Sequence, residues 1–181
     1  MDHQLLQELI KLSLQDDRHA FRKIVEGHQS MLFSVAFRML GNEEDAKDIV
    51  QETFIRIWTH LSKYKPEQKF STWIYSIATN LCLDKLKSAK RKLRLEDQGD
   101  ALKLLLSNDD GERTLMNNEL GAIIETLTNE LSPKQKMVFT LRYLEDIEMD
   151  EIVKVTGLST EKIKSNLYLA RQTIGRKLKN Y

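Results

Sequence analysis

The strongest chemical signal in the sequence is a run of positive charge at the end of the chain. Six basic residues and no acidic ones lie between Lys162 and Tyr181, although the whole chain has a net charge of only +1. Basic side chains on one helix can neutralise the phosphates of a nucleic acid. The carboxyl end of any helix also favours Lys and Arg because of the helix dipole. The run therefore indicates either a contact with a polyanion or the solvated end of a helix.

Charge is also segregated in the middle of the chain. Residues 85–94 hold six basic side chains and no acid, whereas residues 96–112 hold six acids and one base, Lys103. Such a separation says more about partners than the total charge does. The near-neutral total therefore does not exclude a nucleic-acid partner.

The residue types that catalysis or metal binding would need do not form useful patterns. The four histidines, His3, His19, His28 and His60, lack metal-ligand spacing, and the one cysteine, Cys82, has no evident partner. The sequence has no glycine-rich phosphate loop. We therefore expect no enzyme, no metal, no other cofactor and no small-molecule substrate.

The sequence gives no sign of export or membrane insertion. A lone cysteine cannot form an internal disulfide, and the first residues, MDHQLLQELIKLSLQDD, lack the basic-then-apolar layout of a signal peptide. The longest uncharged stretch, Phe70 to Leu83, has 14 residues and is broken by polar ones, too short to span a bilayer. We expect a cytoplasmic protein.

Helical periodicity dominates the chain and no strand-like alternation persists, which predicts an all-α fold. The composition agrees, with 41% hydrophobic residues, seven glycines and two prolines. We predict five helices in the first part of the chain. The first covers residues 5–12, the second follows caps at Asp16 and Asp17, and the third covers residues 31–39 and ends at the Gly41–Asn42 turn. The fourth covers residues 42–61 and the fifth covers residues 70–92.

A change in composition predicts two small helical domains. Residues 91–118 are charged and include Gly99 and Gly111, which indicates a flexible acidic linker with room for a short docking helix at Leu102 to Leu106. The first domain would span residues 1–90 and the second residues 119–181.

The second domain has the outline of a helix-turn-helix. One helix begins after a Ser132 cap with Pro133 at its first position. A separate short helix then ends at Gly157, and a longer basic helix follows. Ile152, Leu158 and Ile163 would pack the two helices together, and Ser159 or Thr160 would cap the second. An apolar stripe from Ile163 through Leu167, Ala170 and Ile174 to Leu178 leaves the opposite face for a DNA groove or for water.

Three stretches in order make the chain resemble the bacterial sigma-70 family, specifically the short extracytoplasmic-function (ECF) sigma factors. They are "DAKDIVQETFIRIW", "KFSTWIYSIATNLCLDKLK" and "LSPKQKMVFTLRYLEDIEMDEIVKVTGLSTEKIKSNLYLAR". The resemblance covers about residues 18–90 and 119–179. It implies two helical sigma domains, region 2 and region 4, that bind core RNA polymerase and direct it to promoters.

The resemblance assigns the polymerase contact to the predicted helix over 42–61. Asp48, Gln51 and Glu52 fall on the family's core-binding motif. Asp45, Asp48 and Glu52 are spaced i, i+3, i+7 and form one acidic stripe, so the alternative is the solvated face of an amphipathic helix.

The resemblance also implies that residues around the start of the fifth helix hold flipped single-stranded bases of the minus-10 element. Aromatic rings stack on bases, Asn reads base edges and Lys neutralises phosphate. For Trp73 the alternative is a core position, because it is spaced with Ile77 and Leu81. The candidates are Tyr64, Lys65, Lys69, Ser71, Thr72, Trp73 and Asn80, with Tyr75 on the same helix.

On the last helix the resemblance implies major-groove contacts with the minus-35 element. The candidates are Ser159, Thr160, Lys164, Ser165, Tyr168 and Arg171. The chain departs from the family at Asn166 and Leu169, where a basic residue is common, and at Val153, which is bulkier than usual. Exposed Leu169 could meet a thymine methyl or an inhibitory partner.

We therefore expect a non-enzymatic initiation factor whose partners are core RNA polymerase, promoter DNA and an anti-sigma factor. The acidic linker would either thread toward the RNA exit path of the polymerase or act as a plain connector. Two alternatives stay open: a stand-alone helix-turn-helix regulator that binds duplex DNA tightly without polymerase, and a helical protein that only sequesters partners.

Overall fold

The computed structural model describes residues 2–96 and 126–179, with side chains described outside residues 90–96. Within these ranges every regular element is helical, which confirms the all-α prediction. The expected linker, apart from its first residues, and the possible docking helix at Leu102 to Leu106 lie outside the described residues.

The first domain is a bundle of four α-helices, and its helix starts follow local capping signals. Asp17 accepts hydrogen bonds from the backbone N–H groups of His19 and Ala20, and Asn42 accepts one from Asp45 at 2.8 Å. These side chains satisfy donors that have no partner within a helix. The elements are α1 (His3–Ser13), α2 (Arg18–Leu40), α3 (Glu43–His60), the 3₁₀ turn η1 (Leu61–Lys63) and α4 (Phe70–Glu96).

One predicted helix boundary is wrong. The helix expected after Asp17 and the one expected over residues 31–39 form the single continuous helix α2. Gly27 lies inside it, and an interior glycine costs only about 1 kcal/mol, which packing against α1, α3 and α4 offsets. The helix ends where expected, at Gly41 with φ +72°. At the other end of the domain, α4 continues to Glu96, past the expected boundary at residue 90.

The second domain has the predicted helix-turn-helix. Ser132 and Gln135 form a capping box at the start of α6 (Pro133–Phe139), which leads into a π-helical turn, η3 (Thr140–Leu144). A short helix, α7 (Met149–Thr156), ends at Gly157 with φ +65°, and α8 (Thr160–Leu178) follows. Ile152 and Ile163 are fully buried between them, as the sequence predicts.

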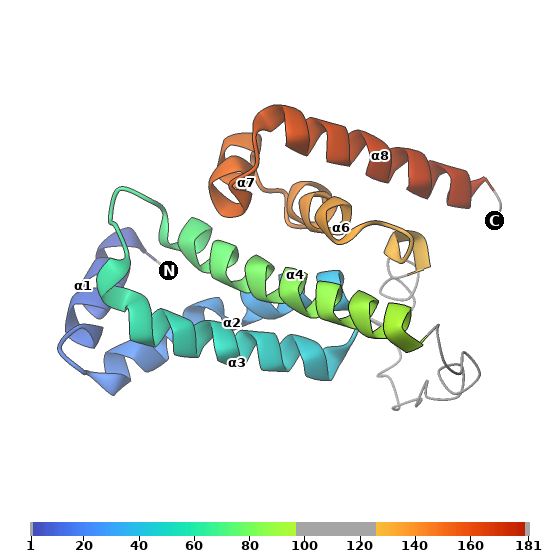
Figure 1. Cartoon of the computed structure of the whole chain (residues 1–181). Helices are drawn as coiled ribbons and strands as arrows, with labels where there is room; N and C mark the ends of the chain where they lie inside the picture. Colours follow the sequence, from blue (N-terminus) through green and yellow to red (C-terminus); the bar gives the residue numbers. More distant parts are fainter. Residues whose placement is uncertain (1, 97–125, 180–181) are drawn as a thin grey trace.

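The two domains pack against each other, with α7 and α6 lying across α4 and α8 on the outer side (Figure 1). One apolar cluster belongs to the first domain alone and includes Ile24, Leu32, Ile57 and Ile74. A second cluster is shared, because it joins Val35, Met39, Tyr75, Cys82 and Leu83 of the first domain to Met137, Val138, Leu141, Ile152, Val155 and Ile163 of the second. The composition predicts two domains but not this shared core.

Candidate polymerase and promoter interfaces

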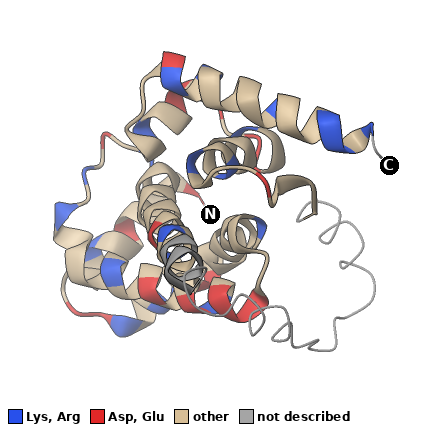
Figure 2. Ribbon diagram, turned by 45° about the vertical axis from the view of Figure 1, so that its right-hand side comes forward, with Lys and Arg blue, Asp and Glu red and all other residues tan. Residues whose placement is uncertain are grey.

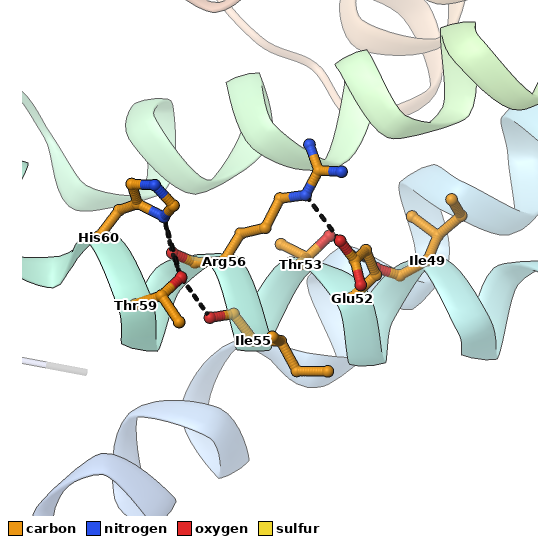
Figure 3. A network of polar contacts seen from close by, with 7 residues as sticks. All are labelled: Ile49, Glu52, Thr53, Ile55, Arg56, Thr59 and His60. Carbon is orange, nitrogen blue, oxygen red and sulfur yellow. Dashed lines mark hydrogen bonds and ion pairs between the residues drawn. The ribbon is translucent and has the colours of Figure 1, made fainter.

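The acidic residues predicted to bind polymerase lie on the outer face of α3. Asp48 and Gln51 are exposed. Glu52 is half-buried and pairs with Arg56 one turn later, Nε to Oε1 at 2.8 Å (Figure 3). Because these residues follow one another at i, i+3 and i+4, the structure brings all three onto one face. An ion pair at this exposure contributes little stability, but it fixes the direction of the Glu52 carboxylate.

An exposed apolar residue beside this face was missed by sequence reasoning. Ile55 is 58% exposed and follows Gln51 by four residues, a spacing that puts both on the same side of α3. It lines a shallow apolar pocket together with Arg18, Phe21, Phe54 and Trp58. The available signal was an isoleucine placed away from the apolar stripe of an amphipathic helix. A mixed acidic and apolar surface of this kind suits a protein partner.

The loop before α4 and the first turn of α4 bring three aromatic rings together. The Tyr64 and Trp73 ring centroids are 5.4 Å apart, and buried Phe70 lies edge-on to Tyr64 at 5.2 Å. The Tyr64 hydroxyl donates to the Gln68 carbonyl at 2.7 Å, which ties the loop to itself. Trp73 is half-buried, so it packs against Tyr64 and Phe70 and still offers surface to a base.

The other predicted minus-10 residues are not on one surface. Asn80 is exposed and follows Trp73 by seven residues, two turns along the same side of α4. Lys65 and Lys69 are exposed in the loop and Ser71 is half-buried. Thr72, by contrast, is only 3% exposed because α7 covers it. The sequence-predicted set therefore divides between an open side of α4 and a side beneath the second domain.

Glu151 of α7 occupies the covered side. Its carboxylate accepts a hydrogen bond from the Thr72 hydroxyl and lies 3.4 Å from the Lys69 ammonium. The Thr72 hydrogen bond is the main cause that lowers the pKa of Glu151 from its ordinary value, with further help from Lys154 and Lys69. Burial also raises the pKa of Tyr75, which follows Thr72 by three residues on α4 and is 8% exposed. A carboxylate that favours its charged form thus lies against two predicted DNA contacts, Thr72 and Lys69.

The outer face of α8 presents the predicted minus-35 residues. The Ser159 hydroxyl accepts from the Lys162 N–H at 3.4 Å as the cap, and Thr160 is half-buried. Gln172 donates to the Tyr168 hydroxyl oxygen at 2.6 Å and holds that ring in place. Basic residues occur along the length of α8 (Figure 2). Exposed on this face are Lys164, Ser165, Tyr168 and Arg171.

The positions where α7 and α8 depart from the expected pattern differ in their surroundings. Asn166 donates its side-chain amide to the Lys162 carbonyl at 2.7 Å, so it extends the helix hydrogen bonding. Leu169 is 43% exposed on the outer face of α8, as expected. Leu178, which the sequence places at the end of the buried stripe, is 57% exposed and the stripe ends before it. Half-buried Val153 packs against the shared cluster.

Two features of the described residues bear on metal binding and thiol chemistry. In residues 2–96 and 126–179 no group of three or more His, Cys, Asp or Glu side chains could hold a metal ion. Cys82 is fully buried, and burial raises the pKa of its thiol to about 12, which disfavours the thiolate form that nucleophilic attack requires. None of the helices described is long and apolar enough to cross a bilayer.

Comparison with known proteins identifies the family of this chain. The family model described as Sigma-70 region 2 matches residues 24–92, and the model described as Sigma-70, region 4 matches residues 121–174. The chain belongs to the sigma-70 family. Region 2 thus contains α3, the loop and most of α4, and region 4 contains α6, α7 and most of α8.

The curated relatives place it in the ECF subfamily. The chain is 28% identical over 183 residues to "ECF RNA polymerase sigma factor SigW" of Bacillus subtilis, covering 97% of this chain and 98% of the relative. It is 27% identical over 182 residues to "ECF RNA polymerase sigma-E factor" of Escherichia coli, covering 95% and 93%. The similarity therefore spans both regions, and the protein is an ECF sigma factor.

Two solved structures share the fold of this sigma factor. CnrH in complex with the cytosolic domain of CnrY has a TM-score of 0.68 at 20% identity, over 97% of this chain and 98% of that one. The sigma factor RpoE in complex with the anti-sigma factor NepR from Bartonella quintana has a TM-score of 0.69 at 18% identity, over 88% and 96%. The chain thus shares its fold with both solved structures, one of which is described as a sigma factor.

Proposed function

We propose that this ECF sigma factor binds core RNA polymerase through the outer face of α3 and places the polymerase at promoters through α4 and α8. The single observation that carries the assignment is the match to both region 2 and region 4, in family order. The geometry supports it, because an exposed acidic face on α3 and an exposed basic face on α8 are separate surfaces. One chain can therefore contact polymerase and DNA at the same time.

The residues we assign to polymerase binding are Asp48, Gln51 and Glu52, with Ile55 as an added apolar contact. Asp48 and Glu52 give the surface its negative charge, and the Glu52–Arg56 pair fixes one carboxylate. Complementary charge steers association and sets specificity more than it adds affinity. Exposed Ile55 would supply buried apolar area at the centre of the interface.

We assign minus-35 recognition to the exposed face of α8, with Lys164, Ser165, Tyr168 and Arg171 in the major groove and the Ser159–Thr160 end near a phosphate. We assign minus-10 recognition to Tyr64, Lys65, Lys69, Ser71, Thr72, Trp73 and Asn80. The aromatic pair would stack on unpaired bases and the lysines would neutralise phosphates. The protein would act as a non-enzymatic factor in the cytoplasm.

Reconstitution with core polymerase tests the proposal. The protein is mixed with core RNA polymerase, the complex is isolated by size exclusion, and run-off transcription is measured on a promoter library. We expect a stable complex and transcripts that depend on the protein. No complex and no dependent transcript would refute the proposal. Tight duplex binding without polymerase would instead support the stand-alone regulator.

We also propose an anti-sigma partner, since both solved relatives described above carry a bound partner, and one of them is named an anti-sigma factor. The exposed apolar side chains of α8, Tyr168 and Leu169, offer a contact for it. Affinity purification of the tagged protein from its own host, followed by mass spectrometry, tests this. A partner that displaces core polymerase from the complex is the expected result, and a polymerase-only pull-down would count against it.

A further inference from the structure

The outer face of α8 carries a hydrogen-bonded pair of exposed side chains, Tyr168 and Gln172. Gln172 lies on the side of the helix opposite the buried residues Ile163, Leu167 and Ala170. Its amide nitrogen donates to the hydroxyl oxygen of Tyr168, one turn earlier, at 2.6 Å. Tyr168 itself is 54% exposed. The polar ends of the two side chains therefore meet on the surface that we assign to minus-35 DNA.

The direction of this hydrogen bond decides what the pair offers to a ligand. A tyrosine hydroxyl has one proton to donate, and a glutamine side chain has one carbonyl oxygen beside its amino group. Because the Tyr168 oxygen accepts from Gln172, the hydroxyl proton of Tyr168 is available to donate outward. The Gln172 amide leaves its Oε1 atom as an acceptor. The pair thus presents one donor and one acceptor side by side.

A neighbouring donor and acceptor match a single base edge in the major groove. Adenine presents an acceptor, N7, beside a donor, the N6 amino group. Guanine presents two acceptors, so its O6 would face Gln172 Oε1 with the same sign of partial charge. Thymine presents O4 and a methyl group, and cytosine presents one amino donor. Adenine is therefore the base that satisfies both groups of the pair at once.

Leu169 extends this match to the whole base pair. It is 43% exposed and follows Tyr168 directly in the chain. At 3.6 residues per turn, Gln172 lies about 40° round the helix from Tyr168, and Leu169 lies about 60° further in the same direction. An A·T pair presents adenine N7, adenine N6, thymine O4 and the thymine methyl group in this order across the groove. The donor, the acceptor and the apolar side chain of α8 follow the same order.

From this order we propose that Tyr168, Gln172 and Leu169 act as one unit that selects an A·T pair in the minus-35 element, with Gln172 as a specificity-determining residue. The inference rests on the minus-35 function proposed above for α8. The Tyr168 hydroxyl donates to adenine N7, and Gln172 Oε1 accepts from adenine N6. Leu169 packs on the methyl group of the paired thymine. Lys164 and Arg171, on one flank of this face, contact other positions of the element.

Modified bases in the promoter test each contact on the wild-type protein. The full chain is combined with core polymerase, and binding of the holoenzyme is measured on duplex promoters that vary at single minus-35 positions. We expect one position at which A·T is preferred about tenfold over the other pairs. At that position 7-deazaadenine removes N7, and uracil in place of thymine removes the methyl group. Each analogue should weaken binding by about two- to fivefold.

Variants of the chain show which side chain reads which group. Tyr168→Phe keeps the ring and loses the hydroxyl donor, so it should bind the 7-deazaadenine promoter and the unmodified promoter equally. Leu169→Ala should bind the uracil promoter and the thymine promoter equally. Gln172→Glu offers only acceptors, so its preference should move to the pair that places cytosine, with its amino donor, where the wild type selects adenine.

A second amide on α8 provides the matched control. Asn166 donates to the Lys162 carbonyl at 2.7 Å, so its amide takes part in the hydrogen bonding of the helix itself. Gln172→Leu and Asn166→Leu remove the same chemical group from one helix. Gln172→Leu should lower the A·T preference to less than about twofold at the one position. Asn166→Leu should keep the wild-type preference, and circular dichroism checks that both variants fold.

Any of three results would overturn the inference. The first is a wild-type holoenzyme with no minus-35 position that prefers A·T. The second is an equal loss on every promoter sequence in Gln172→Leu, which would show that Gln172 contacts phosphate or only stabilises α8. The third is an analogue effect that persists unchanged in both Tyr168→Phe and Leu169→Ala.

Run-off transcription with core polymerase separates this failure from failure of the proposed function. Wild-type transcripts that depend on the protein and on the minus-35 element, alongside any of the three results, refute the A·T reading alone. Absence of any protein-dependent transcript refutes the function on which the reading rests.

Discussion

Tyr64 and Trp73 stack obliquely across the start of α4, with ring centroids 5.4 Å apart and ring planes inclined by 39°. One ring comes from the loop and the other from the helix, and buried Phe70 supports both. This arrangement orders two aromatic side chains before any ligand arrives. It reduces the entropy that a stacked base would otherwise have to offset.

Replacement of Tyr64 separates the role of its ring from that of its hydroxyl. Tyr64→Leu should weaken binding of minus-10 single-stranded DNA to the holoenzyme by about 1 to 3 kcal/mol, because a stacking surface is lost. Tyr64→Phe keeps the ring and loses the hydrogen bonds of the hydroxyl, including the one to Gln68, so its DNA affinity should stay near wild type. Equal losses in both variants would show that loop geometry, not stacking, sets the affinity. Fluorescence anisotropy with promoter oligonucleotides measures the difference.

Charge reversal on α3 should remove polymerase binding while the protein stays folded. Asp48→Lys with Glu52→Lys changes two side chains on the surface and breaks only the Glu52–Arg56 pair, worth about 0.3 to 0.5 kcal/mol. Co-purification with core polymerase gives the outcome and circular dichroism confirms folding.

A control for the charge is Glu8→Lys with Glu26→Lys, at exposed positions on α1 and α2. This variant should bind polymerase like the wild type. If both double variants lose binding, the effect is one of net charge, and α3 is not specifically the interface.

Lys164→Ala should weaken use of minus-35 elements by about 1 to 3 kcal/mol, selectively at one base pair, if its ammonium reads a base edge. Lys164 is exposed near the beginning of α8, within reach of a groove. Run-off transcription on promoters that differ at single minus-35 positions provides the measurement. A uniform loss on all sequences would instead identify a phosphate contact.

Two glycines offer a matched test of the helix-turn-helix backbone. Gly157 has φ +65° and an added Cβ would meet no atom within 4 Å, so Gly157→Ala should cost about 1 to 2 kcal/mol from backbone strain alone. Gly175 lies inside α8 with the same open surroundings, so Gly175→Ala should stabilise by about 0.5 to 1 kcal/mol. Urea denaturation measures both, and a change of the same sign in the two variants would contradict the strain argument.

His28 should make stability depend on pH. Burial is the main cause that lowers the pKa of His28 below its ordinary 6.5, while Nδ1 lies 2.8 Å from the Ile24 carbonyl oxygen. Below about pH 6.5 the unfolded chain takes up a proton that the folded chain resists, so stability is full above this pH and falls as the pH drops. Thermal unfolding as a function of pH measures the effect.

His28→Asn keeps a donor for the Ile24 carbonyl and removes the titrating group. The decline in this pH window should therefore be smaller in the variant, even if its absolute stability is lower. A decline of equal size in both proteins would assign the pH dependence to other groups.

Local signals in the sequence were enough for most of the fold. Caps at Asp17, Asn42 and Ser132 and the stop at Gly157 were identified because capping depends on residues within one helical turn. The continuous α2 was missed because a single interior glycine weakens a helix locally, and only packing with other helices shows that the weakening is tolerated.

The parts of the site that could not be predicted depend on contacts far apart in the chain. The Thr72 hydroxyl and the Glu151 carboxylate are 79 residues apart in sequence, and Arg38 and Glu145 are 107 apart. No periodicity links such positions. The sequence places Thr72 on α4 correctly but cannot show that another helix covers it. Ile55 was detectable in principle, as an apolar residue on the polar side of α3.

The exposure of Asp48 while Thr72 is covered has a thermodynamic consequence for the packed arrangement of the two domains. Because Asp48 stays exposed, polymerase can bind α3 without displacing α7. Polymerase binding and DNA binding are then linked through the separation of the two domains. A polymerase that favours the separated form and a promoter strand that requires it each raise the other's affinity by the same factor. Any partner that binds the packed form more tightly must then lower the affinity for polymerase and the affinity for the promoter strand, even when it touches neither binding surface.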